Sequence, residues 1–145
     1  MRIEQSNSVS LAYEALPLLQ SLDQLYPGFQ DWYLKTVIPG LALGRDKLLV
    51  ALEGTRIIGV ALGKRADDET KLRCVRVIPE FEHSGVGIRL IDNVLDVLEC
   101  EKPHCTVAEE MLHSYSRAFV QRYGFQLSAV DKGRYRRGVL EYSFN

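Results

Sequence analysis

The stretch Val77–Ile91, with the sequence VIPEFEHSGVGIRLI, joins a segment typical of a buried strand to an amphipathic helix. Upstream, β-branched and apolar residues run as far as Pro79, as expected for a strand buried in a sheet. Downstream, apolar side chains recur at helical spacing, while acidic and amide side chains occupy the opposite face. The pattern therefore predicts a strand, a loop and a helix in this order.

Gly85 and Gly87 stand where the predicted loop passes into the helix. The first backbone N–H groups of a helix have no partner within the helix, and the helix dipole adds partial positive charge at that end. Because glycine has no Cβ atom, phosphate oxygens can come close to the main chain here. A Gly-x-Gly pair alone is most often a simple turn, but between a strand and a helix it indicates a phosphate site.

Two common phosphate loops do not fit this stretch. A dinucleotide fingerprint needs glycine or alanine where Leu90 stands, and a P-loop needs a Gly-Lys-Ser/Thr sequence that is absent. The stretch instead resembles motif A of the GNAT superfamily of N-acetyltransferases, in which Arg/Gln-x-x-Gly-x-Gly/Ala follows the fourth strand. Pro79-Glu80-Phe81 and Gly85-Val86-Gly87 are in register with that motif, whereas Glu82 stands where Arg or Gln is usual.

A second segment, Ser116–Phe125, resembles motif B of the same superfamily. The resemblance is carried by the residues from Ala118 to Phe125. The tyrosine that often serves as the general acid in the family aligns with Val120, and the family's asparagine aligns with His113. Because valine cannot donate a proton, a catalytic acid must come from another residue.

The resemblance implies an α/β (α+β) fold in which residues 1–145 form a single N-acetyltransferase domain. A mixed, mostly antiparallel sheet would be flanked by helices, with its fourth and fifth strands splayed apart. The cosubstrate would be acetyl-CoA, with its pantetheine arm in the notch between these strands. The residues implied to bind it are Val75 and Val77 for the arm, His83, Ser84, Gly85, Val86, Gly87 and Ile88 for the pyrophosphate, and His113 as a helix cap or CoA contact.

Acetyl transfer to an amine needs a base that takes a proton from the amine. Glu109, at the end of the predicted fifth strand, is the first candidate, because bases of this family often lie at that end of the notch. Glu110 and Glu69 are the alternatives. Each of the three also fits the pattern of a solvated surface carboxylate.

The reaction also needs an acid that protonates the departing thiolate. With about 3.6 residues per helical turn, Tyr123 lies near the face of Val120, while Tyr115 is rotated away from it. Tyr123 is therefore the predicted acid, although an aromatic side chain there is more often part of the core. Cys105 has no evident histidine partner, so we expect direct attack by the amine rather than a covalent enzyme intermediate.

Trp32 and Tyr33 occupy the region where the family builds its acceptor pocket, although aromatic residues at helical spacing are more often core. The predicted function is acetyl transfer to a primary amine of a small molecule or peptide. One alternative is a non-catalytic acyl-CoA-binding module, suggested by Val120 and Glu82. The other is acetylation of an RNA-linked amine, suggested by a basic cluster near the C-terminus: Lys132, Arg134, Arg136 and Arg137.

The net charge of −1 argues against general attraction to nucleic acids or membrane surfaces. No apolar run approaches the roughly 20 residues that span a bilayer, and the first residues lack a hydrophobic signal core, so we expect a cytoplasmic protein. Cys74, Cys100 and Cys105 lack the spacing of metal ligands, which predicts free thiols and no metal site. Nothing in the chain decides between a monomer and a homodimer.

The remaining patterns predict the order β-α-α-β-β-β-α-β-α-β-β. The first helix runs from Leu11 to Tyr26, and the second ends before Pro39-Gly40. Two strand-like runs separated by Gly54-Thr55 form a hairpin, and the last residues alternate as a strand.

Overall fold

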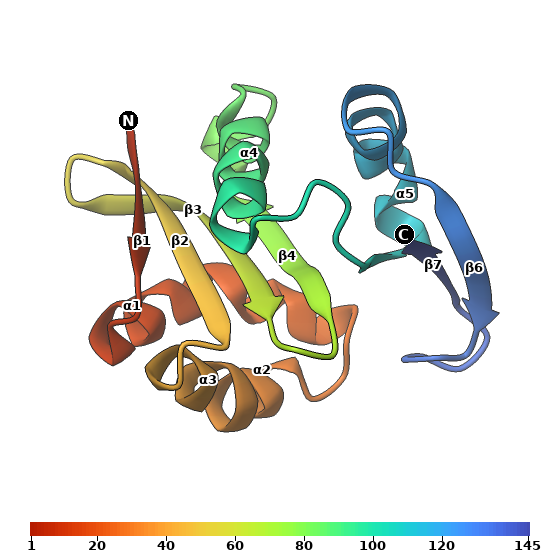
Figure 1. Ribbon diagram of the computed structural model, residues 1–145, viewed down its shortest axis with the longest axis horizontal. Coiled ribbons are helices and arrows are strands. Elements are labelled where there is room, and N and C mark those ends of the chain that lie inside the picture. The colour runs from red at the N-terminus through yellow and green to blue at the C-terminus, as the bar shows by residue number, and fades with distance from the viewer.

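The computed structural model describes all residues from Met1 to Asn145 and contains two antiparallel sheets (Figure 1). The first sheet has the strand order β1-β2-β3-β4 and the second has the order β5-β7-β6. The strands of the first sheet are β1 Arg2–Ser6, β2 Asp46–Glu53, β3 Arg56–Arg65 and β4 Thr70–Val77. Those of the second sheet are β5 Cys105–Ala108, β6 Leu127–Lys132 and β7 Leu140–Phe144.

Helices cover both faces of the first sheet and one face of the second. The α-helices are α1 Val9–Leu19, α2 Phe29–Trp32, α3 Ile38–Ala42, α4 Val86–Leu98 and α5 Glu109–Ser116. Short 3₁₀ segments lie at Gln20–Gln24 and Pro79–Phe81, and π-helical segments at Tyr33–Val37 and Arg117–Arg122. Figure 1 shows α4 on one side of the first sheet and α1 to α3 on the other, while α5 packs on β5 and β7.

The predicted order of elements and the fold class are confirmed, with two differences in the first helices. The second helical region does not stop before Pro39-Gly40, because α3 begins at Ile38 with the proline in its first turn. A proline in that position lacks only an N–H that has no partner within the helix anyway. The first helix ends as an α-helix at Leu19, soon after Pro17, and continues as a 3₁₀ segment.

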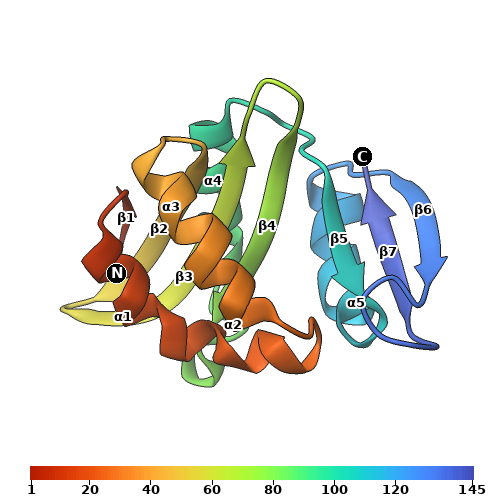
Figure 2. The same cartoon turned by 90° about the horizontal axis from the view of Figure 1, so that it is seen from below.

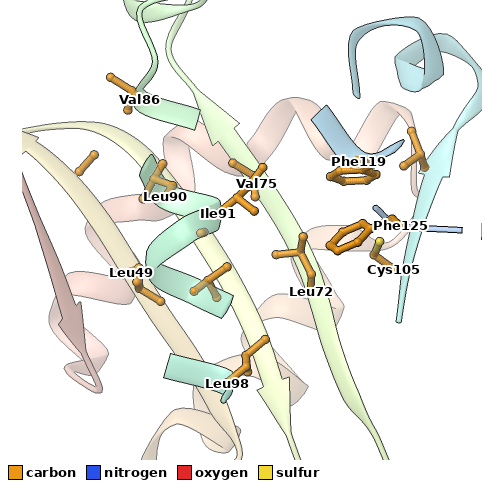
Figure 3. Packing of buried hydrophobic residues seen from close by; sticks show 14 of the residues in the cluster. Leu49, Leu72, Val75, Val86, Leu90, Ile91, Leu98, Cys105, Phe119 and Phe125 are labelled. Carbon is orange, nitrogen blue, oxygen red and sulfur yellow. The ribbon is translucent and has the colours of Figure 1, made fainter. Parts of the chain in front are cut away.

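Apolar side chains form two buried clusters, one on each face of the first sheet. One lies between the sheet and α1 to α3. The other lies under α4 and extends across to the second sheet, where Phe119, Phe125 and Cys105 face Leu72 and Val75 (Figure 3). Helix α4 packs closely on β3 because Gly59 has no side chain: an added Cβ would lie 2.8 Å from Leu90 Cδ1. This packing sets the position of the N-terminus of α4 relative to β4.

Strands β4 and β5 pair only where β5 begins and then separate. The Leu72 N–H donates to the carbonyl of His104 at 3.0 Å, and the His104 N–H donates to the carbonyl of Thr70 at 3.0 Å. A single parallel bridge, Lys71 to His104, is the only strand pairing between the two sheets. Figure 2 shows the sheets as separate units with β4 and β5 as adjacent edge strands. The predicted splay of the fourth and fifth strands is therefore confirmed.

None of the helices has the length and apolar character needed to cross a membrane.

Candidate functional site

The space between the diverging parts of β4 and β5, which we call the notch, holds a small cavity of about 60 Å³. Its walls come from β4 and β5, and Tyr115 and Phe119 close it on the side of the α5 region. Tyr115 reaches across the notch, because its hydroxyl donates to the carbonyl of Val75 on β4 at 2.7 Å. The tyrosine therefore occupies a main-chain acceptor that a ligand in the notch could otherwise use.

Beyond Leu72, the edge of β4 toward the notch has no strand partner. The Val75 carbonyl points into the notch, since it accepts from Tyr115, whereas the other edge of β4 pairs with β3. Peptide groups of a strand alternate between its two edges, so those of Val75 and Val77 share the notch side. These are the two residues predicted to line the pantetheine arm.

The N-terminus of α4 lies just beyond the end of β4 and is not capped by any side chain. Its N-cap residue, Gly85, has a φ of 90°, a left-handed conformation that favours glycine. A Cβ added there would meet nothing within 4 Å, so the space over the first turn is open. The free N–H groups of this turn and the helix dipole are the features on which the predicted phosphate site depends. Glu82 lies nearby as an exposed side chain and reduces the positive potential there.

A larger cavity, of about 280 Å³, adjoins the notch and shares Tyr26, Arg73 and Thr106 with it. Trp32 lines this large cavity, and the Arg73 guanidinium lies over its ring at 5.0 Å from the centroid. Tyr33, the other residue predicted to bind the acceptor, is fully buried in the core, where its hydroxyl donates to the carbonyl of Ala12 at 2.6 Å. Of the predicted pair, only Trp32 is part of the cavity wall.

The three carboxylates predicted as bases lie outside both cavities. Glu69 contacts Lys64 and Lys71 at 2.7 and 3.3 Å, and the hydrogen bond from Lys64 is the main reason why its pKa is lowered. Glu110 accepts a hydrogen bond from Arg136 at 2.7 Å. Glu109 is exposed and forms no ion pair; it follows Ala108, which lines the notch. Among the three, Glu109 is the one at the end of the notch without a competing partner.

Sequence reasoning did not identify Glu141, the buried carboxylate beside the site. Its residue is 3% exposed, and the Tyr26 hydroxyl donates to it at 2.7 Å. Burial raises the pKa of Glu141, although the hydrogen bond from Tyr26 and the charges of Arg134 and Arg136 act in the opposite direction. A carboxylate with a raised pKa suits a base that works near neutral pH. In the sequence it is one polar residue of an alternating strand, which gave no signal of burial.

The two tyrosines of the motif B region lie in different places. The Tyr123 hydroxyl donates to Asp92 on α4 at 2.7 Å, and the side chain lines neither cavity. Burial is the first cause that raises the pKa of Tyr123 to about 12, followed by the hydrogen bond to Asp92. Tyr115 is the phenol in the notch, and burial raises its pKa to about 12 as well. Val120, at the family's usual acid position, is half exposed.

The thiols of Cys74 and Cys105 both line the cavities, and burial raises the pKa of each to about 12. Because the thiolate is the nucleophilic form, neither thiol is suited to attack a substrate at neutral pH. His113 lies on the exposed side of α5. The arrangement therefore combines an uncapped helix N-terminus, a splayed strand edge and two adjoining cavities, with a buried carboxylate beside them and no activated nucleophile.

Comparisons with known proteins agree with this arrangement. Residues 44–127, more than half of the chain, match the family model of the acetyltransferase (GNAT) domain. No curated protein matches the chain in sequence.

Three similar solved structures each align with 99% of this chain. A crystal structure assigned to the GNAT acetyltransferases, from Desulfovibrio desulfuricans, has a TM-score of 0.77 at 20% identity over 96% of its own chain. The PaiA N-acetyltransferase of Thermoplasma acidophilum, in complex with coenzyme A, has a TM-score of 0.69 at 14% identity over 98% of its chain. A ribosomal-protein-alanine N-acetyltransferase of Brucella melitensis has a TM-score of 0.75 at 12% identity over 98% of its chain. The TM-scores show a shared fold, and the match to the family model shows that the chain belongs to the GNAT acetyltransferase family.

Proposed function

We propose that this protein is an N-acetyltransferase that transfers the acetyl group of acetyl-CoA to a primary amine by direct attack, with residues 1–145 as one catalytic domain. The observation that carries the proposal is the pairing of the open N-terminus of α4 with the notch next to it. The helix N-terminus suits a pyrophosphate, and the notch suits the extended pantetheine arm of a coenzyme A thioester. The coenzyme A complex of the PaiA enzyme, which has the same fold, supports this assignment.

The chemistry follows from what surrounds the point where the notch meets the large cavity. The amine nitrogen attacks the thioester carbonyl carbon, the carbon–sulfur bond then breaks, and the thiolate takes up a proton. Main-chain N–H groups on the free edge of β4 can stabilise the oxygen that becomes negative during attack. Holding both substrates together makes the step effectively unimolecular, so modest acid and base catalysis is sufficient.

For the base, Glu141 acting through Tyr26 is the arrangement that the contacts support. Tyr26 lines both cavities, so its hydroxyl lies where the amine must arrive, and it donates to the carboxylate of Glu141. As the ammonium group gives a proton to the Tyr26 oxygen, the phenolic proton passes to Glu141. Glu109 remains the predicted alternative, with direct access from the end of the notch.

For the acid, Tyr115 is better placed than Tyr123. The Tyr115 hydroxyl is already in the notch, where the departing thiolate must form, whereas the Tyr123 hydroxyl is held by Asp92 on the other side. Both phenols remain protonated at neutral pH, which an acid requires. The variants Tyr115→Phe and Tyr123→Phe distinguish the two tyrosines by their effect on kcat.

Two measurements test the proposal. Thermal melting with excess acetyl-CoA should raise the melting temperature, since a ligand of the native state stabilises it by about 2.7 kcal/mol at a hundredfold excess over Kd. Release of free CoA should then increase when a panel of small amines and peptides is added. No stabilisation at millimolar acetyl-CoA would contradict the proposal at its first step.

A second candidate is a protein that binds acyl-CoA without turnover. It is favoured by the contact between Tyr115 and Val75, which keeps the notch closed, and by the valine at the usual acid position. Tight CoA binding combined with no acceptor-dependent CoA release would favour this candidate over catalysis.

A further inference from the structure

The wall of the large cavity carries positive charge and no negative charge. Its lining includes Lys71, Arg73 and Arg134, and it contains no aspartate or glutamate. This imbalance contrasts with the chain as a whole, which contains 18 lysine and arginine residues and 19 aspartate and glutamate residues. The lining itself is therefore basic, and the acidic partners of its cations, Asp46, Glu69 and Asp131, lie behind it.

Two of these cations are only partly neutralised by other side chains. Arg73 is the exception, since its Nε lies 2.8 Å from the buried carboxylate of Asp46. Lys71 lies 3.3 Å from Glu69, but the same carboxylate is held more closely by Lys64, at 2.7 Å.

The ion pair between Arg134 and Asp131 is long, at 3.5 Å, and its side chains are 41% and 48% exposed. Exposed ion pairs of this kind contribute little to the free energy of folding. Lys71 and Arg134 can thus still bind an anion. Their charges also help to lower the pKa of His104, after the larger effect of burial.

The two cations stand away from the point where the chemistry would occur. Lys71, His104 and Arg134 line only the large cavity, whereas Tyr26 and Thr106 line both the large cavity and the notch. An amine that meets the thioester at the notch, beside Tyr26, would therefore place the rest of its molecule toward Lys71 and Arg134.

The remaining walls and the size of the cavity limit what that molecule can be. Leu22, Phe29, Trp32 and Tyr135 supply apolar and aromatic surface. The volume of about 280 Å³ is near the lower end of the roughly 300–1,000 Å³ found for small-molecule sites. A small compound with an amine, an anionic group and an apolar body satisfies all three features of the cavity.

We infer that the acceptor is a small amine that also carries an acidic group, with the anion bound between Lys71 and Arg134 and the amine beside Tyr26. An α-amino acid with an apolar side chain is the simplest compound of this class. The inference rests on the proposed acetyl transfer and goes further, because it names the group that the cavity selects.

The test compares amines with and without an acidic group. L-Phenylalanine, L-phenylalaninamide and phenethylamine share the amine and the ring, whereas phosphoethanolamine carries a phosphate and has no ring. Release of free CoA from acetyl-CoA is measured for each. We expect kcat/KM for phenylalanine to exceed that for the amide by about tenfold or more, because a cation without its anion stays unpaired in the cavity. Faster turnover of phosphoethanolamine would instead identify phosphate as the anionic group.

Variants connect this preference to the two cations. Lys71→Met and Arg134→Met should each reduce the preference for the acid over the amide to less than threefold, with acetyl-CoA affinity unchanged. Arg137→Met is the matched control, since Arg137 belongs to the same hairpin but lines neither cavity, and it should keep the wild-type preference.

Calorimetric titration of phenylalanine and its amide into the CoA complex gives the same comparison without turnover. Equal binding and equal turnover of the two compounds, or a preference that survives in both variants, would overturn the inference while leaving acetyl transfer intact. Failure of acetyl-CoA to stabilise the protein would instead remove the proposed function, and the acceptor assignment with it.

Discussion

Replacing Tyr115 by phenylalanine should lower the stability of the free protein and, at the same time, increase its affinity for coenzyme A. The Tyr115 hydroxyl donates to the Val75 carbonyl across the notch at 2.7 Å. In the proposed complex the pantetheine arm takes this carbonyl as its own acceptor, so the tyrosine has to withdraw. The variant removes the contact from the free protein and leaves the complex nearly unchanged.

The magnitude follows from the energy of one buried hydrogen bond. Such a bond contributes about 1 kcal/mol net, so the free variant should lose about that much stability. For a chain of this size, a change of about 1 kcal/mol lowers the melting temperature by roughly 2–4 °C. The same free energy appears in binding, because the ligand no longer competes with the tyrosine, and Kd for CoA should fall about fivefold.

Melting curves and calorimetric titrations with CoA measure both quantities on one preparation. The melting temperatures of wild type and Tyr115→Phe should differ without ligand and converge at saturating CoA. Tyr123→Phe is the matched control, because its hydroxyl bonds to Asp92 outside the notch. It should lose stability with and without ligand and keep the wild-type Kd.

An unchanged or higher Kd in Tyr115→Phe would refute the competition between the tyrosine and the ligand. Turnover of the two variants supplies a separate result. If Tyr115 is the acid, kcat falls in Tyr115→Phe despite tighter binding; if Tyr123 is the acid, kcat falls only in the control.

Four further predictions concern the base, the anion site and the buried ion pair. In Glu141→Gln, turnover should fall by about two to four decades. Because burial raises the pKa of Glu141, the wild type loses stability as pH rises through that pKa. The melting temperature of the variant should therefore exceed that of the wild type at alkaline pH and equal it in acid. A pH series of melting curves measures this difference. Glu109→Gln should retain activity if Glu141 is the base. A decrease in the kcat of this variant by about two decades or more would instead identify Glu109 as the base. Gly85→Leu should weaken CoA binding in titrations, since its side chain enters the space over the helix N-terminus and its φ of 90° disfavours any side chain. Arg73→Met leaves the buried Asp46 with only Arg45 at 3.3 Å, and should destabilise by about 3 kcal/mol in denaturant unfolding, with much of the loss recovered by adding Asp46→Asn.

Local sequence patterns were sufficient to predict the order of elements and the strand, turn and helix start around Gly85. The junction from Val77 to Ile91 could be interpreted because a strand, a turn and a helix start depend on neighbouring residues only. The uncapped Gly85 with its left-handed backbone confirms that interpretation. The resemblance to a known family then supplied the splay of β4 and β5, which no local pattern contains.

Helical spacing alone does not give the directions of the two tyrosines, because the helix is irregular between them. A regular helix of about 3.6 residues per turn predicts Tyr123 near the face of Val120. Residues Arg117–Arg122 form a π-helical segment, and the Tyr123 N–H donates to the carbonyl of Ala118, five residues earlier. The wider turn changes the direction of every later side chain, so Tyr123 faces α4 while Tyr115 faces the notch.

The sequence by itself thus determined which segments are strands and helices and where to expect a phosphate site, since these properties arise from residues close together in the chain. Only the tertiary structure decided which side chains line the cavities and which carboxylate is buried beside them. Glu141 becomes a buried carboxylate because β7 brings it to Tyr26, 115 residues away in the chain. Trp32 and Tyr33 are adjacent, yet one lines the cavity and the other fills the core. Burial, charge pairing and pKa depend on contacts between distant segments, and these contacts exist only once the chain has folded.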